Sequence, residues 1–342
     1  MGARAGIDLG GTKIQAVVVD GRNRVTGQAR RPTPAAGGPA AVIEGMAEAV
    51  REAASGAGLD GGTIVGVGVG SPGTADVTEG TVSQALNVSP DWVEPVPLAA
   101  QLREMLGAPV KLGNDVEVAT NAEYRLGAGR PYRSLLGVFW GTGVGGGLVL
   151  GGKSWTGRGA AGEIGHMVVK RGGSRCTCGR RGCLEAYAGR AAMERRARRE
   201  LKKGRRSTRL FEIMEERGKP RLTSGIWARA LDADDELAEY LIERAVRALG
   251  AGIASAVNLL DVEAVILGGG LGVRLGDTHL ERIAKAMEPH LFAADRPPAL
   301  HVAELGDLGG AIGAALLIPS RPSRKRSPSR AARARPRTGA PA

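Results

Sequence analysis

The residues whose types and spacing indicate metal chemistry lie between positions 159 and 185. The three cysteines of the sequence, Cys176, Cys178 and Cys183, form a C-x-C-x4-C loop, and His166 lies ten residues before the first of them. Three thiolates and one imidazole are the ligand set of a closed tetrahedral zinc site. We therefore predict that these four residues bind a structural Zn2+ ion, which would fix a loop that apolar burial alone could not hold.

Two other interpretations of the cysteines are reduced, buried thiols and a disulfide bond. Three cysteines within eight residues, among glycine and arginine, are not typical of a buried segment. The odd cysteine count argues against a disulfide. We also expect no secretory signal, because Met1 leads within six residues into a strand. These features together predict a protein of the reducing cytoplasm.

Two carboxylates flank the predicted metal loop. Glu163 lies three residues before His166, and Glu185 lies two residues after Cys183. Folding the loop around one ion would bring both carboxylates to one place as rigid hydrogen-bond acceptors. Acceptors of this kind suit a polyol, so this segment predicts a sugar ligand.

The composition indicates which elements could position these residues. A length of 342 residues with 43% apolar content allows two globular domains, each with its own core. No apolar run approaches the roughly 18 residues that span a bilayer, so we expect no membrane association. Of the net charge of +12, eight charges lie in residues 320–342, which contain no acidic residue and leave +4 on the rest. We expect this tail to be disordered and solvated rather than to bind polyanions, and we do not expect a nucleic-acid partner.

A glycine turn between two strands is predicted near the N-terminus. A strand from Ala5 turns at Gly10 and Gly11 and resumes over residues 15–20. Backbone N–H groups of such a turn can approach a phosphate closely because no Cβ intervenes. Thr12 adds a hydroxyl, and Asp8 adds a carboxylate that could hold Mg2+ through water. A strand follows the glycines where Walker and Rossmann motifs require a helix. An ordinary hairpin is the alternative interpretation.

The same strand–glycine–strand pattern occurs a second time. An apolar strand over residues 134–140 is followed by Gly141, Thr142 and Gly143, and then by a strand over 148–150. The two copies lie about 130 residues apart. We interpret them as a duplicated domain with one phosphate loop in each half.

Three further segments are candidates for the same site. A strand over residues 110–112 leads through Asn114 and Asp115 into a helix over 116–126. Helix capping is one interpretation of these two residues. The other is that Asp115 acts as a general base in phosphoryl transfer, because ligands bind where strands of α/β sheets end.

Asn87 lies in a polar loop that could contact sugar or be a plain turn. A buried strand over 262–271 ends in glycines that could lie against adenosine or form a tight turn.

The remaining periodicity predicts helices between these segments. They are expected over residues 40–57, 98–106, 189–235 in several charged pieces, 234–260 and 308–317.

With these pieces placed, residues 5–318 resemble the ROK family (repressors, open reading frames and kinases) of bacterial sugar kinases, and most closely its glucokinases. The motifs of the resemblance are GIDLGGTKI from Gly6, ND at Asn114, GTGVGGG from Gly141, GEIGH from Gly162 and CTCGRRGCLE from Cys176.

The resemblance implies an α/β fold of the actin/hexokinase-like (ribonuclease H-like) type, with two domains and a cleft between them. The first domain would take residues 1–115 and a returning helix at 305–319, and the second residues 116–304. The implied activity is phosphorylation of a hexose 6-hydroxyl by ATP with Mg2+, with glucose as the expected substrate. The family also suggests a homodimer or homotetramer.

The resemblance assigns roles residue by residue. Asp115 matches the catalytic base and a sugar contact, and the other sugar contacts would be Asn87, Asn114, Glu163, His166 and Glu185. The phosphate and adenosine contacts would be Asp8, Gly10, Gly11, Thr12, Lys13, Gly141, Thr142, Gly143, Gly269 and Gly270. The zinc ligands would be His166, Cys176, Cys178 and Cys183. His166 would then use one ring nitrogen for zinc and leave the other free to donate toward the sugar.

One departure and two alternatives remain open at this point. Phe139 and Trp140 precede the second turn where many relatives have smaller residues, which leaves open ATP or polyphosphate as the donor. The sugar could be another hexose or an N-acetylhexosamine. A sugar-responsive repressor would need an N-terminal helix-turn-helix domain, for which we expect no room, and the basic tail lacks aromatic residues for stacking.

Overall fold

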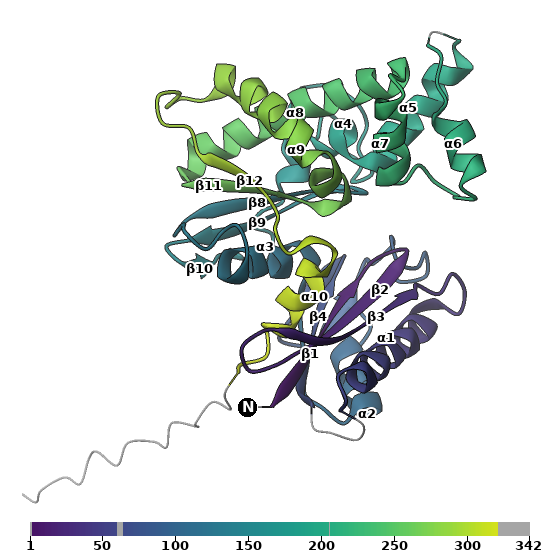
Figure 1. Ribbon diagram of the computed structural model, residues 1–342, viewed down its shortest axis with the longest axis vertical. Helices are drawn as coiled ribbons and strands as arrows, with labels where there is room; N and C mark the ends of the chain where they lie inside the picture. The colour runs from purple at the N-terminus through teal and green to yellow at the C-terminus, as the bar shows by residue number, and fades with distance from the viewer. Residues whose placement is uncertain (1, 60–63, 205, 321–342) are drawn as a thin grey trace, which may run out of the picture.

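Runs of β-branched residues and glycine form the first of two five-stranded sheets in the described residues (Figure 1). A computed structural model describes residues 2–59, 64–204 and 206–320. The segment expected to be a disordered tail, residues 320–342, lies outside the described residues except for Ser320. The first sheet has the order β3-β2-β1-β4-β7. Its strands are β1 (Ala3–Leu9), β2 (Lys13–Val19), β3 (Val25–Pro32), β4 (Ile64–Ser71) and β7 (Val110–Asn114).

A second five-stranded sheet has the order β10-β9-β8-β11-β12. In each sheet the glycine turn joins an antiparallel pair, β1–β2 or β8–β9, and the first strand of the pair has a parallel neighbour on its other side. The repeated pattern in the sequence therefore takes the same position in two similar sheets. The strands of the second sheet are β8 (Leu135–Trp140), β9 (Val144–Leu150), β10 (Lys153–Ser154), β11 (Ala264–Gly268) and β12 (Ala299–Val302), and a separate small pair is β5 (Thr74–Asp76) with β6 (Thr81–Ser83).

Helices cover both faces of the first sheet. Successive side chains of β2 point to opposite faces, so this strand contributes to a core on each side. Ile14, Ala16 and Val18 pack in the core with helix α1 (Gly38–Gly56) and helix α2 (Leu98–Leu106). Val17 and Val19 pack on the opposite face, in the core formed by helix α10 (Gly309–Ala315).

The second sheet is covered mainly by long amphipathic helices. Helix α8 (Glu236–Leu260) and helix α9 (Gly269–Met287) pack with β8 and β11 in the largest core of the molecule. Helix α3 (Asp115–Leu126) packs on β9. The shorter helices are α4 (Glu185–Ala188), α5 (Arg190–Lys202), α6 (Leu210–Glu216) and α7 (Ser224–Asp232), and the 3-10 turns are η1 (Ile164–His166), η2 (Glu288–His290) and η3 (Gly306–Leu308).

The predicted helices and strands differ from the observed ones at their ends. The helix expected from residue 234 begins at Glu236, because the Asp235 carboxylate accepts the N–H of Ala238 at 2.8 Å and caps it. The strand expected to run to residue 271 ends at Gly268. Gly269 has φ +78°, which ends the strand and begins α9.

The chain passes between the two sheets twice, and both passages meet at Glu123. Helix α3 leaves β7 of the first sheet, and α10 returns after β12 of the second and packs on α3. The buried Glu123 carboxylate of α3 accepts the N–H groups of Ala128 at 3.1 Å, Glu304 at 3.1 Å and Leu305 at 2.8 Å. One side chain therefore fixes the returning segment to the first passage.

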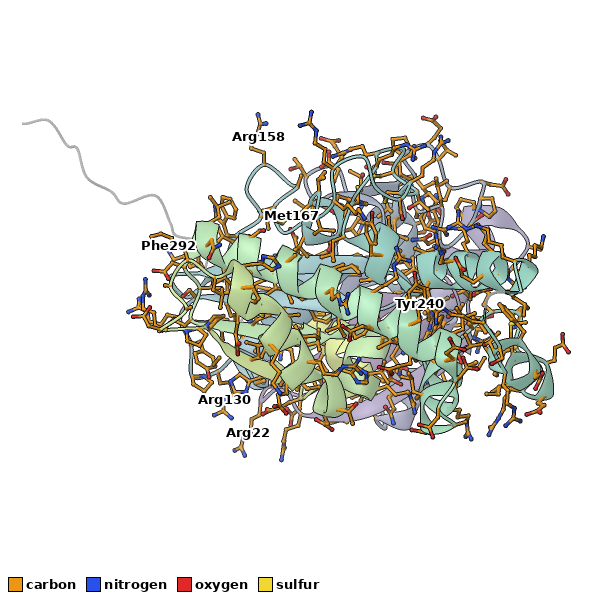
Figure 2. All side chains as sticks on the ribbon, turned by 90° about the horizontal axis from the view of Figure 1, so that it is seen from above. Arg22, Arg130, Arg158, Met167, Tyr240 and Phe292 are labelled. Carbon is orange, nitrogen blue, oxygen red and sulfur yellow. The ribbon has the colours of Figure 1, made fainter. Side chains whose placement is uncertain are left out.

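The exposed surface is rich in arginine, which lies on loops as well as helices. Figure 2 shows Arg22, Arg130 and Arg158 extending outward and labels Tyr240, a half-buried residue of α8. The guanidinium of Arg206 lies 4.3 Å from the centre of the Tyr240 ring. No helix in the described parts of the chain combines the length and hydrophobicity that crossing a membrane would require.

Candidate active site

Parallel strands of the first sheet end at one edge, and several predicted site residues lie there. Asp8 of β1 pairs with Gly70 of β4, and Ser71 of β4 pairs with Asn114 of β7. Asp115, the next residue, is the first of α3. The strand register therefore brings Asp8 and Asp115 to the same edge, as expected for a ligand site of an α/β sheet.

Asn114 has the capping role that was one of its two interpretations. Its side-chain oxygen accepts the N–H groups of Val116 at 3.0 Å and Glu117 at 3.1 Å. The Asp115 carboxylate accepts the same Val116 N–H at 2.9 Å. The cap fixes the start of α3, so Asp115 is held in a defined position.

The Asp115 carboxyl is half-buried beside other carboxylates. Burial, then the charge of Asp8 and more weakly that of Glu163, raises its pKa to about 6, although the Val116 N–H opposes the shift. Burial also raises the pKa of Asp8, against the charge of Lys13. A carboxylate with a pKa close to neutrality is suited to general-base catalysis. Two neighbouring carboxylates also form an oxygen-rich setting of the kind that Mg2+ prefers.

The first glycine turn is closed by a hydrogen bond from the N–H of Gly10 to the carbonyl of Lys13, at 2.9 Å. Thr33, just after β3, supports the turn from outside. Its hydroxyl donates to the Gly10 carbonyl at 2.6 Å, and its N–H donates to the Thr12 carbonyl at 3.3 Å. Thr33 was not predicted from the sequence, because nothing in its spacing connects it to the turn.

The predicted sugar residue Asn87 lies against the first turn. A Cβ at Gly11 would collide with the backbone carbonyl of Asn87, so glycine is required for this close approach. Lys13 forms an ion pair of 3.7 Å with Asp307 of η3, a partner that the sequence did not indicate. The turn therefore contacts two loops that are remote in sequence.

The second turn is closed differently and contacts the cysteine loop. The N–H of Gly141 donates to the carbonyl of Gly143 at 3.0 Å. The Glu185 carboxylate accepts the N–H of Val144 at 3.1 Å, and a Cβ at Gly143 would collide with it. Arg190 donates to the Thr142 hydroxyl at 2.8 Å. The side chains that hold the second turn, Glu185 and Arg190, are therefore charged, whereas Thr33 at the first turn is neutral.

The glycines expected at adenosine lie beside this second turn. A Cβ at Gly269 would meet the backbone of Trp140, and a Cβ at Gly141 would lie 3.9 Å from the Gly270 nitrogen. Ser224, the first residue of α7, also approaches Gly270. The structure thus brings Gly141 and Gly270 together at the ends of the parallel strands β8 and β11.

Trp140, the departure from the family pattern, has a structural role here. Its side chain is fully buried, and its indole N–H donates to the Ala188 carbonyl of α4 at 2.7 Å. The Phe139 ring packs where a Cβ on Gly268 would lie. Trp140 therefore ties the strand before the second turn to the helix that follows the cysteine loop, and Phe139 packs on the neighbouring strand β11.

His166, Cys176, Cys178 and Cys183 come together as predicted. Their ligand atoms all lie within 4.8 Å of one another, and the three cysteines are free thiols. The sulfurs of Cys178 and Cys183 are 3.7 Å apart. This matches the edge of about 3.8 Å that a tetrahedron with Zn–S bonds of about 2.3 Å requires. The residues fit a zinc ion.

Two carboxylates extend this cluster toward the rest of the site. Nδ1 of His166 lies 3.9 Å from the Cys176 sulfur, while its Nε2 lies 3.9 Å from the Glu163 carboxylate. The other oxygen of Glu185 accepts from the Thr177 hydroxyl at 3.2 Å and from the Cys176 thiol at 3.7 Å. Glu185 therefore links the cluster to the second turn by a hydrogen bond, whereas the charge of Glu163 acts on Asp115 by raising its pKa.

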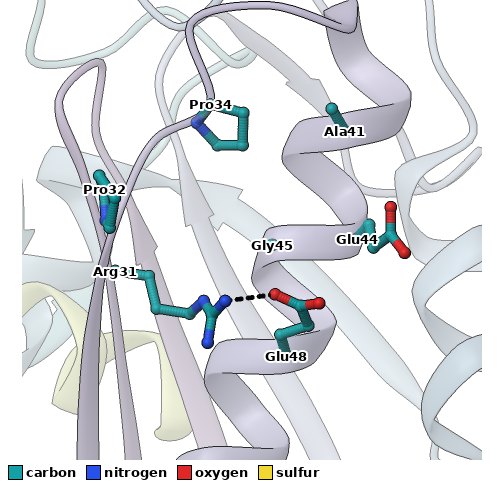
Figure 3. Close-up of a pocket in the computed structure, with 7 residues that line it drawn as sticks. All are labelled: Arg31, Pro32, Pro34, Ala41, Glu44, Gly45 and Glu48. Carbon is teal, nitrogen blue, oxygen red and sulfur yellow. Dashed lines mark ion pairs between the residues drawn. The ribbon is translucent and has the colours of Figure 1, made fainter.

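Two cavities lie apart from these residues. One, of about 340 Å³, lies between the end of β3 and α1, where Arg31 pairs with Glu48 (Figure 3). The other, of about 280 Å³, lies at the end of α8 beside the exposed Phe292. Neither is lined by a predicted site residue, so the candidate active site is defined by strand ends and polar contacts.

Comparisons with known proteins agree with this geometry. The family description "ROK family" matches residues 4–321. The chain is 34% identical over 327 residues to a glucokinase of Streptomyces coelicolor, which covers 92% of this chain and 97% of the relative. It is 31% identical over 325 residues to an N-acetyl-D-glucosamine kinase of Salmonella paratyphi B, covering 91% and 98% of the two chains.

A solved structure of a ROK family protein is also similar to this chain. A ROK family glucokinase from Streptomyces griseus, in complex with glucose and AMPPNP, is 32% identical, with a TM-score of 0.78 over 92% of this chain and 99% of the other. This similarity confirms the α/β, actin/hexokinase-like fold expected from the sequence.

Proposed function

Because this chain belongs to the ROK family, we propose that it is an ATP-dependent hexose kinase that phosphorylates the 6-hydroxyl of glucose, a glucokinase. The observation that carries the proposal is the position of Asp115. Its carboxyl lies at the edge where β1, β4 and β7 end, with a pKa raised to about 6. The similarity to a glucokinase over 92% of the chain supports glucose as the substrate.

In the proposed reaction Asp115 orients the sugar hydroxyl and takes its proton as the hydroxyl attacks the terminal phosphate. The sugar would be held by Asn87, Asn114, Glu163, His166 and Glu185. The Nε2 side of the half-buried His166 suits this role, because Nδ1 faces Cys176 and would be used by the metal.

The phosphates would bind to the backbone N–H groups of the two glycine turns, with Thr12, Lys13 and Thr142 adding polar side chains. Gly269 and Gly270 would contact adenosine. Asp8 would hold Mg2+ through water, and the ion would neutralise charge on the phosphates.

The cysteine cluster would hold a structural Zn2+ ion and so keep Glu163, His166 and Glu185 in place. We further propose that residues 1–115 with 305–319 form one domain and residues 116–304 the other, and that closure of the two excludes water from the reaction. A cytoplasmic location fits both the supply of ATP and three free thiols.

The substitution Asp115→Asn tests the assignment of the base. Glucose affinity should stay near normal, while kcat should fall by about a thousandfold or more, because general-base catalysis of a poised carboxylate is lost. A coupled assay measures kcat, and calorimetry measures glucose binding. Retention of a tenth of the wild-type kcat would remove Asp115 from this role.

The second candidate substrate is an N-acetylhexosamine, which the similarity to an N-acetyl-D-glucosamine kinase favours. The contacts proposed above bind hydroxyls that several hexoses share. A comparison of kcat/KM for glucose, mannose, fructose and N-acetylglucosamine, with ATP or polyphosphate as the donor, distinguishes these possibilities. A glucokinase requires glucose with ATP to give the highest value.

A further inference from the structure

Arg190 is fixed on the second glycine turn at two points. It is the first residue of α5, and its backbone N–H donates to the Gly141 carbonyl at 3.1 Å. Its guanidinium donates from Nη2 to the Thr142 hydroxyl at 2.8 Å. Thr142 is exposed at the tip of the turn, while Arg190 is half-buried. The guanidinium therefore lies beside the polar groups of the turn.

The charge of Arg190 has no ion-pair partner among the residues that the structure describes. Glu194, one helical turn further along α5, is already used: it pairs with Arg198 at 2.8 Å and accepts the Leu222 N–H at 3.0 Å. Burial lowers the pKa of Arg190, with Glu194 opposing the shift and Arg221 adding to it. A guanidinium remains protonated even so. A partly buried charge without a partner is costly, so this position favours an anion.

Three other cations, two on the same helix and one on the first turn, do have ion-pair partners. On the same helix, Arg196 pairs with Glu200 and Arg198 pairs with Glu194. On the first turn, Lys13 pairs with Asp307. Arg190 is thus a cation that the fold holds next to a glycine turn without a direct ion pair to any described carboxylate.

We propose that Arg190 binds the phosphate chain of the nucleotide at the second turn, together with the hydroxyl of Thr142. The inference rests on the proposed kinase function and adds a residue to it. A planar guanidinium offers several parallel donors that match phosphate oxygens, and these charge-assisted bonds exceed neutral ones in strength. The guanidinium would use Nη2 for Thr142 and its other N–H groups for phosphate.

The substitution Arg190→Gln tests the proposal by direct binding. The Kd for ADP, measured by calorimetry, should rise about tenfold or more, which corresponds to the loss of one charge-assisted contact. The Kd for glucose should stay within about twofold, which shows that the domain is intact. Arg190→Lys should restore part of the affinity for ADP. Arg195→Gln is the matched control, because it removes one exposed positive charge from α5 and should leave ADP binding unchanged.

A positioning role predicts a different pattern. If Arg190 only holds Thr142, then Arg190→Gln should weaken ADP binding no more than Thr142→Val does, and the double variant should bind ADP as well as Thr142→Val alone. If Arg190 contacts phosphate itself, the double variant should bind ADP more weakly than Thr142→Val. The first of these results, or an unchanged Kd for ADP in Arg190→Gln, would overturn the proposal. Wild-type activity with ATP and glucose is measured in parallel. Failure of that assay, with ADP binding still dependent on Arg190, would count against the kinase function alone.

Chemical modification of the wild-type protein gives a test that does not depend on a variant that folds. Phenylglyoxal modifies arginine side chains, and peptide mass spectrometry measures the extent at Arg190. ADP should reduce modification of Arg190 several-fold, whereas glucose alone should not. Equal modification with and without ADP would contradict the proposal.

Discussion

The two glycine turns have the same hairpin pattern and take the same position in their sheets, yet different chemistry supports them. Thr33 holds the first turn through uncharged hydrogen bonds to its carbonyls, and Lys13 there is paired with Asp307. Glu185 and Arg190 hold the second turn. Among the described residues, the second turn alone is joined to the cysteine cluster through Glu185, so loss of the metal should weaken ligand binding at the second turn and leave the first turn intact.

The largest effect that would test this difference is expected from Cys183→Ser. Cys183 is fully buried in the cluster, and loss of a metal site typically costs about 4 kcal/mol or more of unfolding free energy. Zinc content should fall from about one ion per chain, and thermal denaturation should show a clear loss of stability. Thr177→Ser is the control, because it alters the same loop but retains all four ligands. Full stability and full zinc content in Cys183→Ser would contradict the metal site.

A smaller effect is expected from Glu185→Gln, which tests the link itself. The variant keeps one acceptor oxygen but cannot accept both from Val144 and from Thr177. We expect the Kd for ADP to rise five- to thirtyfold, equivalent to about 1–2 kcal/mol, because a neutral amide oxygen accepts the Val144 N–H more weakly than a carboxylate does. Glu163→Gln is the informative comparison, because Glu163 faces His166 and not the turn. Glu163→Gln should weaken glucose binding and leave ADP binding unchanged. The reverse pattern would show that Glu185 does not link the cysteine cluster to the second turn.

The pH dependence of the reaction rate tests Asp115, whose charged neighbours are Asp8 near the first turn and Glu163 near the cysteine cluster. From its pKa of about 6 in the ligand-free protein, we expect kcat/KM to fall about tenfold per pH unit well below that value, since the base must be deprotonated. The same shift has the opposite sign for stability: between the unfolded pKa near 4 and the folded pKa, the free energy of unfolding contributed by Asp115 decreases as pH rises. A pH–rate profile with an acidic limb near 4 would show that burial and Asp8 do not act as described.

The smallest effect is expected from Thr33→Val, which removes the hydroxyl that donates to Gly10. The loss of one neutral hydrogen bond should raise the KM for ATP about fivefold, equivalent to about 1 kcal/mol. Zinc content and glucose binding should not change. Thr33→Ser, which keeps the hydroxyl, should behave as wild type. A loss of zinc in Thr33→Val would mean that the first turn also depends on the cluster.

Local pattern was sufficient to predict much of the fold and part of the site. The period of apolar residues predicted both hairpins and α8, and the clustering of cysteines predicted the group around His166. These features are contiguous in the sequence, so their chemistry can be recognised without knowing the fold.

The supports of the two turns could not be predicted in this way. Thr33, Asp307 and Trp140 act on site residues through contacts that the tertiary structure creates, and no spacing rule connects them. Arg190 carried a faint signal, as a basic residue close after the cysteine loop, but its neighbours Arg195, Arg196, Arg198 and Arg199 made it appear part of a solvated helical face.

The three N–H groups gathered by Glu123 have a mechanical consequence. Because the Glu123 carboxylate hydrogen-bonds to both connections between the two sheets, these connections would act as one hinge. A single hinge would permit rotation of one sheet relative to the other and would oppose their separation. Opening and closing of the proposed domains would then be a rotation about the C-terminal part of α3.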